Sequence, residues 1–298
     1  NELLFEFYSS LFRHWIMIVR KHYLLLKIYR KWMRVQEEPI YISLFVLCVL
    51  SIIIIGLSSI IYSYNDPDFY SQLLVEAHGM LLDIAFIGIL IYWLNQRGDK
   101  KRRIRTYLDE IDDFRHWKSK EAAYRTVGNI KRLNRNGLNI LNLSRCYLKY
   151  TNISEVNLSY SNLNSTDLSE CKMINSIVCH ARFNQSNLSK STLNESDFHN
   201  ALLSGANLEK AFLIKANLSG ANLIKANLKG AYLMYTNLNG ANLLGADLSD
   251  CNLFKADLRN VEGLDIMHLK KVKSLYETTF DPEVEAQVKE HCPELMVA

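Results

Sequence analysis

Two carboxylates stand inside an apolar stretch of this 298-residue chain. Glu76 and Asp83 are separated by two helical turns, a spacing that places both on one face of a helix. Ionisable groups within a membrane are costly and mostly face protein or water, and a symmetric oligomer gathers such carboxylates into rings, as cation-selective pores do. The predicted pore-lining residues on this face are Glu76, Gly79, Asp83, Ile87, Leu90 and Leu94.

A second interpretation of the same carboxylates is open. Glu76 and His78 can lie at the outer interface of the membrane, while Asp83 bonds a neighbouring helix. Two lone spans cannot enclose a water path, so a pore would require several subunits. A homo-oligomer is therefore expected for the pore, with a tetramer favoured over a dimer.

No constellation of residues in the sequence indicates catalysis. The eight histidines are scattered, and no HExxH, GxSxG or paired-cysteine motif occurs. We therefore expect no enzyme, no cofactor and no metal site. Packing accounts for several cysteines, and the set predicts free thiols in a reducing compartment: Cys48, Cys146, Cys171, Cys179, Cys251 and Cys292.

The elements that would position the carboxylates lie in residues 39–97. Residues 40–64 form a long apolar run without a single charge, which predicts a transmembrane helix. A turn at residues 65–68 follows, and a second apolar run predicts a second span at about 73–95. The second run is the weaker signal because it contains Glu76, His78 and Asp83.

Basic residues flank the two predicted spans, whereas the loop between them contains none. This distribution places both termini in the cytoplasm and makes the lipid bilayer a partner of the chain. In residues 1–38, basic residues recur at every seventh position, so a basic amphipathic helix either lies on the membrane surface or packs on the chain's own membrane region. The predicted membrane-surface residues are Arg13, Arg20, Lys27, Arg34, Lys100, Lys101, Arg102 and Arg103.

A repeat of five residues dominates the second half of the chain. From Leu143 to Leu258 every fifth position is a large apolar residue, and 19 of these 24 positions are Leu. A small residue stands two positions before nearly all of them, and the residue between is usually Asn or Asp, as in Ala206–Asn207. A period of five fits neither a helix nor a strand, and it predicts a solenoid whose backbone turns once per repeat.

This repeat resembles the pentapeptide-repeat family, whose consensus is A(D/N)LXX. The resemblance implies a right-handed quadrilateral β-helix with four pentapeptides per coil and an interior filled by the large and small residues. The two spans, a stalk and the repeats together look like a recurring bacterial architecture of membrane-anchored proteins. The resemblance thus implies a multi-pass protein of the bacterial inner (plasma) membrane.

The expected fold is a two-span α-helical membrane region plus this right-handed β-helix, the pentapeptide-repeat solenoid, with a helical C-terminal cap. Residues 98–137 are predicted to form one charged cytoplasmic linker helix with an apolar stripe. The β-helix is expected over residues 138–262. Residues 263–298 are predicted to form a cap of two short helices around Asp281–Pro282, because a solenoid end exposes core and strand edges.

The four-sided register predicts an interaction patch on one side of the rod. It combines apolar and aromatic residues with lysines: Phe212, Ile214, Lys215, Tyr232, Met234, Tyr235, Phe254 and Lys255. Such a patch indicates a contact site, either for subunit pairing or for the chain's own helices. Two other uses are open, namely a partner protein and a nucleotide signal whose base stacks on the aromatics.

Some soluble members of the family mimic DNA with an acidic rod. Residues 141–260 contain 11 Lys or Arg and 9 Asp or Glu, which gives a net charge of +2. DNA mimicry is therefore not expected here.

Two functional hypotheses follow. The first is a homo-oligomeric pore or channel-forming effector whose cytoplasmic rod mediates assembly or signal sensing, with a role in phage defence or stress response suggested by the architecture. The second is a non-conducting, membrane-anchored scaffold that recruits a cytoplasmic partner through the β-helix.

Overall fold

The computed structural model describes residues 52–53, 56, 67–264 and 266–297. The chain divides into two units, Asn1–Lys101 and Arg102–Ala298. Helix α3, Pro67–Asp113, begins in the first unit and ends in the second. The predicted basic helix of residues 1–38, with Arg13, Arg20, Lys27 and Arg34, lies outside the described residues, as does most of the predicted first span.

The described part of the chain contains no helix with both the length and the apolarity needed to cross a membrane. The second predicted span, 73–95, falls within α3, and the structure does not support it as a span. Glu76 and Asp83 interrupt its apolar run, and charged residues follow from Arg97 onward.

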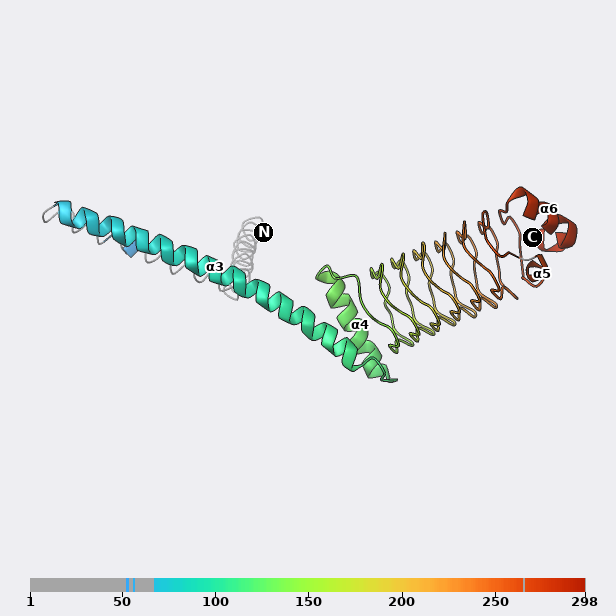
Figure 1. Cartoon of the computed structure of the whole chain (residues 1–298), viewed down its shortest axis with the longest axis horizontal. Coiled ribbons are helices and arrows are strands. Elements are labelled where there is room, and N and C mark those ends of the chain that lie inside the picture. The colour runs from blue at the N-terminus through green and yellow to red at the C-terminus, as the bar shows by residue number, and fades with distance from the viewer. Residues whose placement is uncertain (1–51, 54–55, 57–66, 265, 298) are drawn as a thin grey trace, which may run out of the picture. The chain divides into compact units, whose positions relative to one another are not determined.

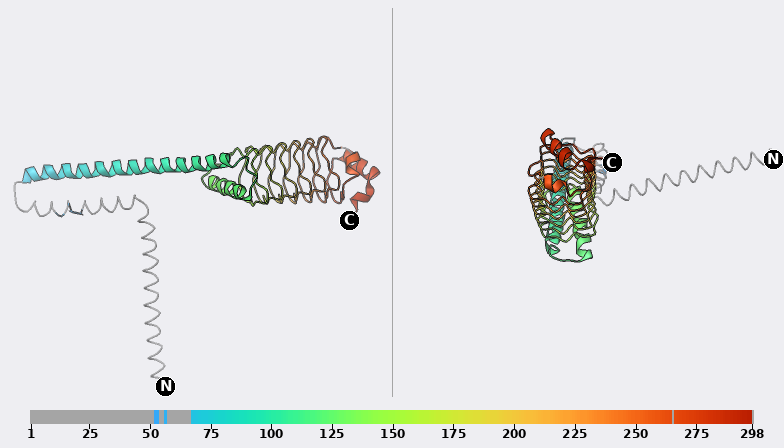
Figure 2. Two further views of the ribbon diagram at one scale, coloured as in Figure 1. Left: turned by 90° about the horizontal axis from the view of Figure 1, so that it is seen from below. Right: turned by 90° about the vertical axis from the view of Figure 1, so that its right-hand side faces the viewer.

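The repeats form a rod of stacked, four-sided coils (Figures 1 and 2). Parallel bridges join each residue before a repeat centre to the equivalent residue of the next coil, for example Phe212 to Tyr232. Leu213 N donates to the Tyr232 carbonyl at 2.9 Å, and Phe212 N donates to the Ser191 carbonyl at 2.9 Å. The predicted β-helix with four pentapeptides per coil is confirmed.

Each repeat turns a corner at the second residue after its centre, where the backbone is left-handed. Lys210 has φ 55°, and Gly230, one coil further on, has φ 65°. Glycine adopts this conformation without strain, whereas other residues have to be held in it by their surroundings. The ladder of hydrogen bonds on both sides of every corner provides that restraint.

The interior of the rod holds the repeat centres and the small residues before them. Leu213, Leu233 and Ala216 are at most 1% exposed. Hydroxyls and thiols on the small-residue positions bond to carbonyls of the neighbouring coil: Thr236 Oγ1 donates to the Leu213 carbonyl at 2.8 Å, and Cys251 Sγ contacts the Leu228 carbonyl at 2.8 Å. These bonds allow polar small residues to alternate with alanine in the core, although the buried Ser186 Oγ has no such partner.

The predicted linker helix of residues 98–137 is two helices in the structure. Helix α3 ends at Asp113, and α4 spans Lys120–Arg135. Ser119 caps α4, since its side chain accepts a hydrogen bond from Ala122 N at 3.1 Å. The break lets α4 return to the first coil as an N-terminal cap (Figure 1).

The N-terminal cap closes the first coil in two ways. Ile130 and Leu133 of α4 are fully buried in the same core as the repeat centres. Arg115 donates to the carbonyls of Ser144 at 2.7 Å and Asn142 at 3.1 Å. The cap thus covers both the apolar end and the carbonyls that no preceding coil can pair.

The C-terminal cap is only partly helical. Helix α5 (Ile266–Leu269), α6 (Pro282–His291) and the 3₁₀ helix η1 (Pro293–Met296) are present. Between α5 and α6, however, the rod continues through the bridges Asn252 to Ser274 and Asp257 to Thr279. The prediction that residues 263–298 consist of two short helices is therefore corrected: two further β-helix rungs separate α5 from α6. Counting in steps of five misses these rungs, because α5 lengthens the chain between bridged residues beyond four pentapeptides.

Gly263 is required by its surroundings where the repeat ends. Its φ is 72°, and an added Cβ would lie 2.6 Å from Leu244 Cα, a backbone atom that can shift only at a cost in stability. Gly240 has a similar φ of 67°, but an added Cβ there would meet nothing within 4 Å. A comparison of substitutions at the two glycines therefore distinguishes the effect of backbone strain from that of steric collision.

We predict that Gly240→Ala lowers the free energy of unfolding by about 1 kcal/mol, from the left-handed backbone alone. Gly263→Ala should lower it by about 1–3 kcal/mol more, because Leu244 has to shift. Urea unfolding followed by circular dichroism measures the difference. Equal losses in the two variants would contradict the collision.

Candidate binding face of the rod

One side of the rod carries aromatic side chains on consecutive coils. Phe212 and Tyr232 point outward from bridged positions, and their rings stack with centroids 4.6 Å apart and planes inclined by 3°. The spacing of hydrogen-bonded strands, about 4.8 Å, sets this distance. Both side chains remain more than a third exposed, at 37% and 38%.

A second aromatic group, which we name the corner cluster, lies at the turn that follows these residues. It consists of Tyr235, Phe254 and Tyr276. The Tyr235 and Phe254 rings meet edge to face at 5.3 Å, and Phe254 and Tyr276 stack at 5.7 Å. Lys255 lies 5.2 Å from the Phe254 ring centroid and pairs with Glu277 at 3.1 Å. The hydrogen bond from Lys255 to Glu277 raises the pKa of Lys255, so its charge is present but already compensated.

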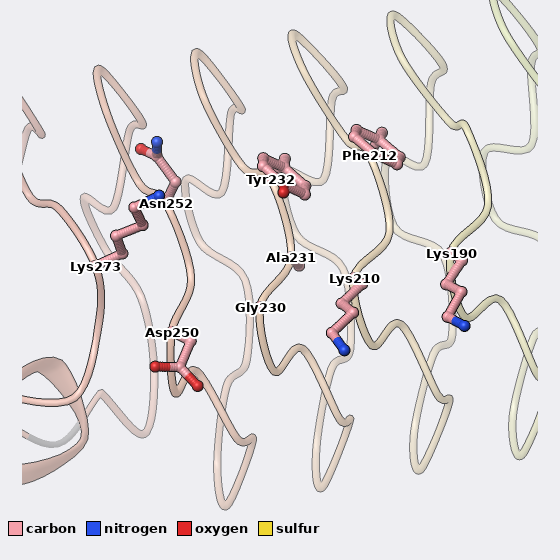
Figure 3. Close-up of a pocket in the computed structure, with 9 residues that line it drawn as sticks. All are labelled: Lys190, Lys210, Phe212, Gly230, Ala231, Tyr232, Asp250, Asn252 and Lys273. Carbon is pink, nitrogen blue, oxygen red and sulfur yellow. The ribbon is translucent and has the colours of Figure 1, made fainter.

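On the other side of the Phe212–Tyr232 stack lies a hollow of about 480 Å³. We call it the lysine hollow, and Figure 3 shows its lining residues on successive coils. Its lining consists of Lys190, Lys210, Phe212, Gly230, Ala231, Tyr232, Asp250, Asn252 and Lys273.

The structure divides the predicted interaction patch into three parts. Phe212 and Tyr232 border the lysine hollow, and Tyr235, Phe254 and Lys255 belong to or touch the corner cluster. Ile214 and Met234 are half-buried turn residues, and Lys215 is exposed at the corner away from the hollow.

Sequence reasoning missed Lys190, Lys210, Lys273 and Tyr276. Lys190 and Lys210 occupy the same corner of successive coils, so the register that predicted Phe212 and Tyr232 could also have found them. Lys273 and Tyr276 could not be found in this way, because they follow the longer bridge spacing after α5.

The predicted pore-lining residues all lie on α3. This helix is continuous over them, so their spacing places them along one side. Glu76, Gly79, Asp83, Ile87, Leu90 and Leu94 are exposed, and so are the basic residues Lys100, Lys101, Arg102 and Arg103.

Five of the six cysteines fall in the described residues, and all five are free thiols, as predicted. Burial raises the pKa of Cys146 to about 11 and the pKa values of Cys171 and Cys251 to about 12. Cys179 is only half-buried, and its Sγ lies 3.2 Å from Ser159 Oγ. Within the described ranges, no group of three His, Cys, Asp or Glu side chains is placed to hold a metal ion.

The repeat matches a family model described as pentapeptide repeats, in eight copies at residues 142–178, 178–209, 201–240 and 231–262. Residues 142–262 form a pentapeptide-repeat domain. The prediction of this family is thereby confirmed for the repeat segment.

Solved structures of other pentapeptide-repeat proteins are similar to this domain. Rfr23 from the cyanobacterium Cyanothece 51142 is 26% identical, with 46% of this chain and 97% of that chain covered and a TM-score of 0.34. HetL from Nostoc sp. strain PCC 7120, a protein involved in heterocyst differentiation regulation, is 23% identical, with 51% and 96% covered and a TM-score of 0.23. QnrB1, a plasmid-mediated fluoroquinolone resistance protein, is 21% identical, with 55% and 76% covered and a TM-score of 0.33.

The chain matches none of the curated proteins with which it was compared. The assignment of the domain rests on its repeat.

The thiols of the pentapeptide-repeat domain provide a test of its packing. At pH 8 we expect iodoacetamide to modify Cys179 first in the folded protein, while Cys171 and Cys251 react only after unfolding. The reason is that the thiolate is the reactive form and burial keeps these two thiols protonated by raising their pKa. Peptide mass spectrometry over time, with urea-unfolded protein as the control, measures the order. Modification of all three at one rate in the folded protein would refute it.

Proposed function

We propose that the protein is a homo-oligomeric membrane protein in which α3 assembles the subunits and conducts ions, while the pentapeptide-repeat domain is a rigid platform for control. The observation that carries this proposal is an apolar segment of α3 with side chains exposed on all sides. Between 43% and 71% of each large apolar side chain is exposed, at Leu82, Ile84, Phe86, Ile87, Ile89, Leu90, Ile91, Trp93 and Leu94.

A helix that is apolar all round is stable only when other apolar groups surround it. Water is a poor surrounding, since each fully exposed Leu or Ile forgoes about 1.5–3 kcal/mol of burial. Lipid and neighbouring copies of the helix both satisfy this requirement. The basic residues Lys100 to Arg103 follow the apolar segment directly, which fits attraction to an anionic membrane surface.

Asp83 is the residue that links the proposed assembly to ion conduction. It is exposed on α3 at the edge of the apolar segment, two helical turns after Glu76. In a symmetric assembly of α3 helices, both positions would form rings of carboxylates, which attract cations and repel anions. Several subunits, four or more, are needed for such rings to surround a water path.

We predict a tetramer or larger oligomer in detergent and a cation-selective current in planar bilayers. Asp83→Asn should lower the cation-to-anion permeability ratio, because it removes one ring of charge. Asp99→Asn is the matched control, since Asp99 is exposed on the same helix beyond the apolar segment. A monodisperse monomer, or no current from folded protein, would overturn the pore.

The corner cluster favours a second candidate function, a non-conducting scaffold. Its three aromatic rings are in contact, and Tyr235 is 47% exposed. The Lys255–Glu277 pair leaves the cluster without net charge. Such a surface suits a partner protein that presents apolar side chains.

A photo-crosslinking residue at position 235 tests the scaffold in cells. We predict a discrete crosslinked partner from Tyr235 that is lost when Phe254→Ser is added, together with a dimeric protein and no bilayer current. Tyr160 is the control position, because it is 58% exposed at another corner of the same rod. The same crosslinked species from both positions would count against a specific docking site.

A further inference from the structure

The lysine hollow holds positive charge that the described residues do not neutralise. Three lysines and one carboxylate, Asp250, line it. Lys190 and Lys273 form no ion pair within the described part of the chain, and Lys210 pairs only with its exposed neighbour Glu209, at 3.7 Å. Lys255, at the opposite corner, is instead held by Glu277. The uncompensated charge suits an anionic ligand.

Space for a ligand exists because Gly230 has no side chain. The coils before and after it carry Lys210 and Asp250 at the same corner, and Figure 3 shows Gly230 between them and next to Tyr232. A Cβ at Gly230 would lie 3.3 Å from Lys210 Cγ. The glycine therefore leaves the corner between Lys210 and Asp250 without a side chain, and it lines the hollow together with Tyr232.

The aromatic stack ends at Tyr232 with one ring face unused by another ring. The next residue in this column is Asn252, which is bridged to Tyr232 and is not aromatic. Asn252 Oδ1 accepts a hydrogen bond from Phe254 N at 3.0 Å, which leaves its amide nitrogen as a donor. A planar ring placed here would extend the stack and meet a hydrogen-bond donor.

We propose that the lysine hollow binds a mononucleotide. The base stacks on Tyr232, the phosphate meets Lys210, and Asp250 accepts a hydrogen bond from a ribose hydroxyl or a base amine. The volume of about 480 Å³ lies within the range of roughly 300–1,000 Å³ typical of small-molecule sites. A free phosphate would leave the ring position empty, and a nucleoside would leave the lysines unpaired.

This site lies on the rod, including the rung that carries Lys273, and does not depend on the pore. Binding is measured by calorimetry, whereas assembly and conduction are measured by stoichiometry and current. A failure of one proposal therefore leaves the other untouched.

The experiment is isothermal titration calorimetry of the full chain in detergent with adenosine monophosphate, inorganic phosphate and adenosine. We expect saturable binding of the nucleotide, and binding at least about 10-fold weaker for phosphate and for adenosine, because each lacks one part of the recognition. Higher salt should weaken nucleotide binding, since exposed lysines are screened.

Two substitutions separate the roles. Lys210→Gln should weaken nucleotide binding about 10-fold, which corresponds to one charge-assisted hydrogen bond. Tyr232→Leu should weaken the nucleotide but leave phosphate unchanged, because it removes stacking only. Lys225→Gln is the matched control: both lysines occupy corner positions with φ 55°, but Lys225 does not line the hollow.

Three results would overturn the site. The first is the absence of saturable heat when folded protein is titrated with adenosine monophosphate up to about 10 mM, because a dissociation constant above that concentration is too weak for a specific site. The second is an equal loss of affinity in Lys210→Gln and Lys225→Gln. The third is tighter binding of a short single-stranded oligonucleotide, which would assign the surface to a nucleic acid.

Discussion

The closure of each coil around the large and small side chains of its four repeats is the constraint on which the pentapeptide-repeat domain depends. The interior admits a Leu such as Leu213 and an Ala such as Ala216, and both are at most 1% exposed. Each buried Leu contributes about 1.5–3 kcal/mol, whereas each left-handed corner costs about 1–2 kcal/mol in a residue other than glycine. The core can therefore hold every corner in its strained form, and the corner residue is free to vary.

Because the corner residue is free to vary, its identity reflects what the surface of the rod does rather than what the backbone requires. At Gly205, Gly220 and Gly240 the corner is relaxed. At Lys190 and Lys210 the same backbone carries lysine, with φ 55° at both. Because a glycine would be easier to accommodate there, the lysines gain nothing from the backbone. Their charge, placed on successive coils beside an aromatic stack, is the property that distinguishes this corner.

The sequence predicted the rod well because its period is set by the coil itself. The repeat centres from Leu143 to Leu258 form the core as expected. Phe212 and Tyr232 stack because they are 20 residues apart, a register that can be read from the sequence by counting. Counting in steps of five fails where the chain departs from that period. Helix α5 changes the spacing between bridged residues, so the positions of Leu275, Tyr276 and Lys273 cannot be predicted by counting. It also fails between α3 and α4, because residues 114–119 contain no Pro or Gly and only Ser119 marks the start of a new helix. The packing of α4 on the first coil is a tertiary contact, and no periodic pattern in the sequence predicts it.

The rod and α3 solve the problem of apolar surface in different ways. The rod buries its apolar residues within itself and needs cover only at its ends, where Leu133 of α4 and Leu275 and Val288 near the C-terminus are fully buried. Helix α3 satisfies its own backbone but leaves Leu82 and Ile84 more than half exposed. The unmet free energy of burial thus lies in α3, whereas the rod offers recognition through its outward columns. This division is the basis of the proposed function, in which α3 assembles the subunits and the rod selects a ligand or a partner.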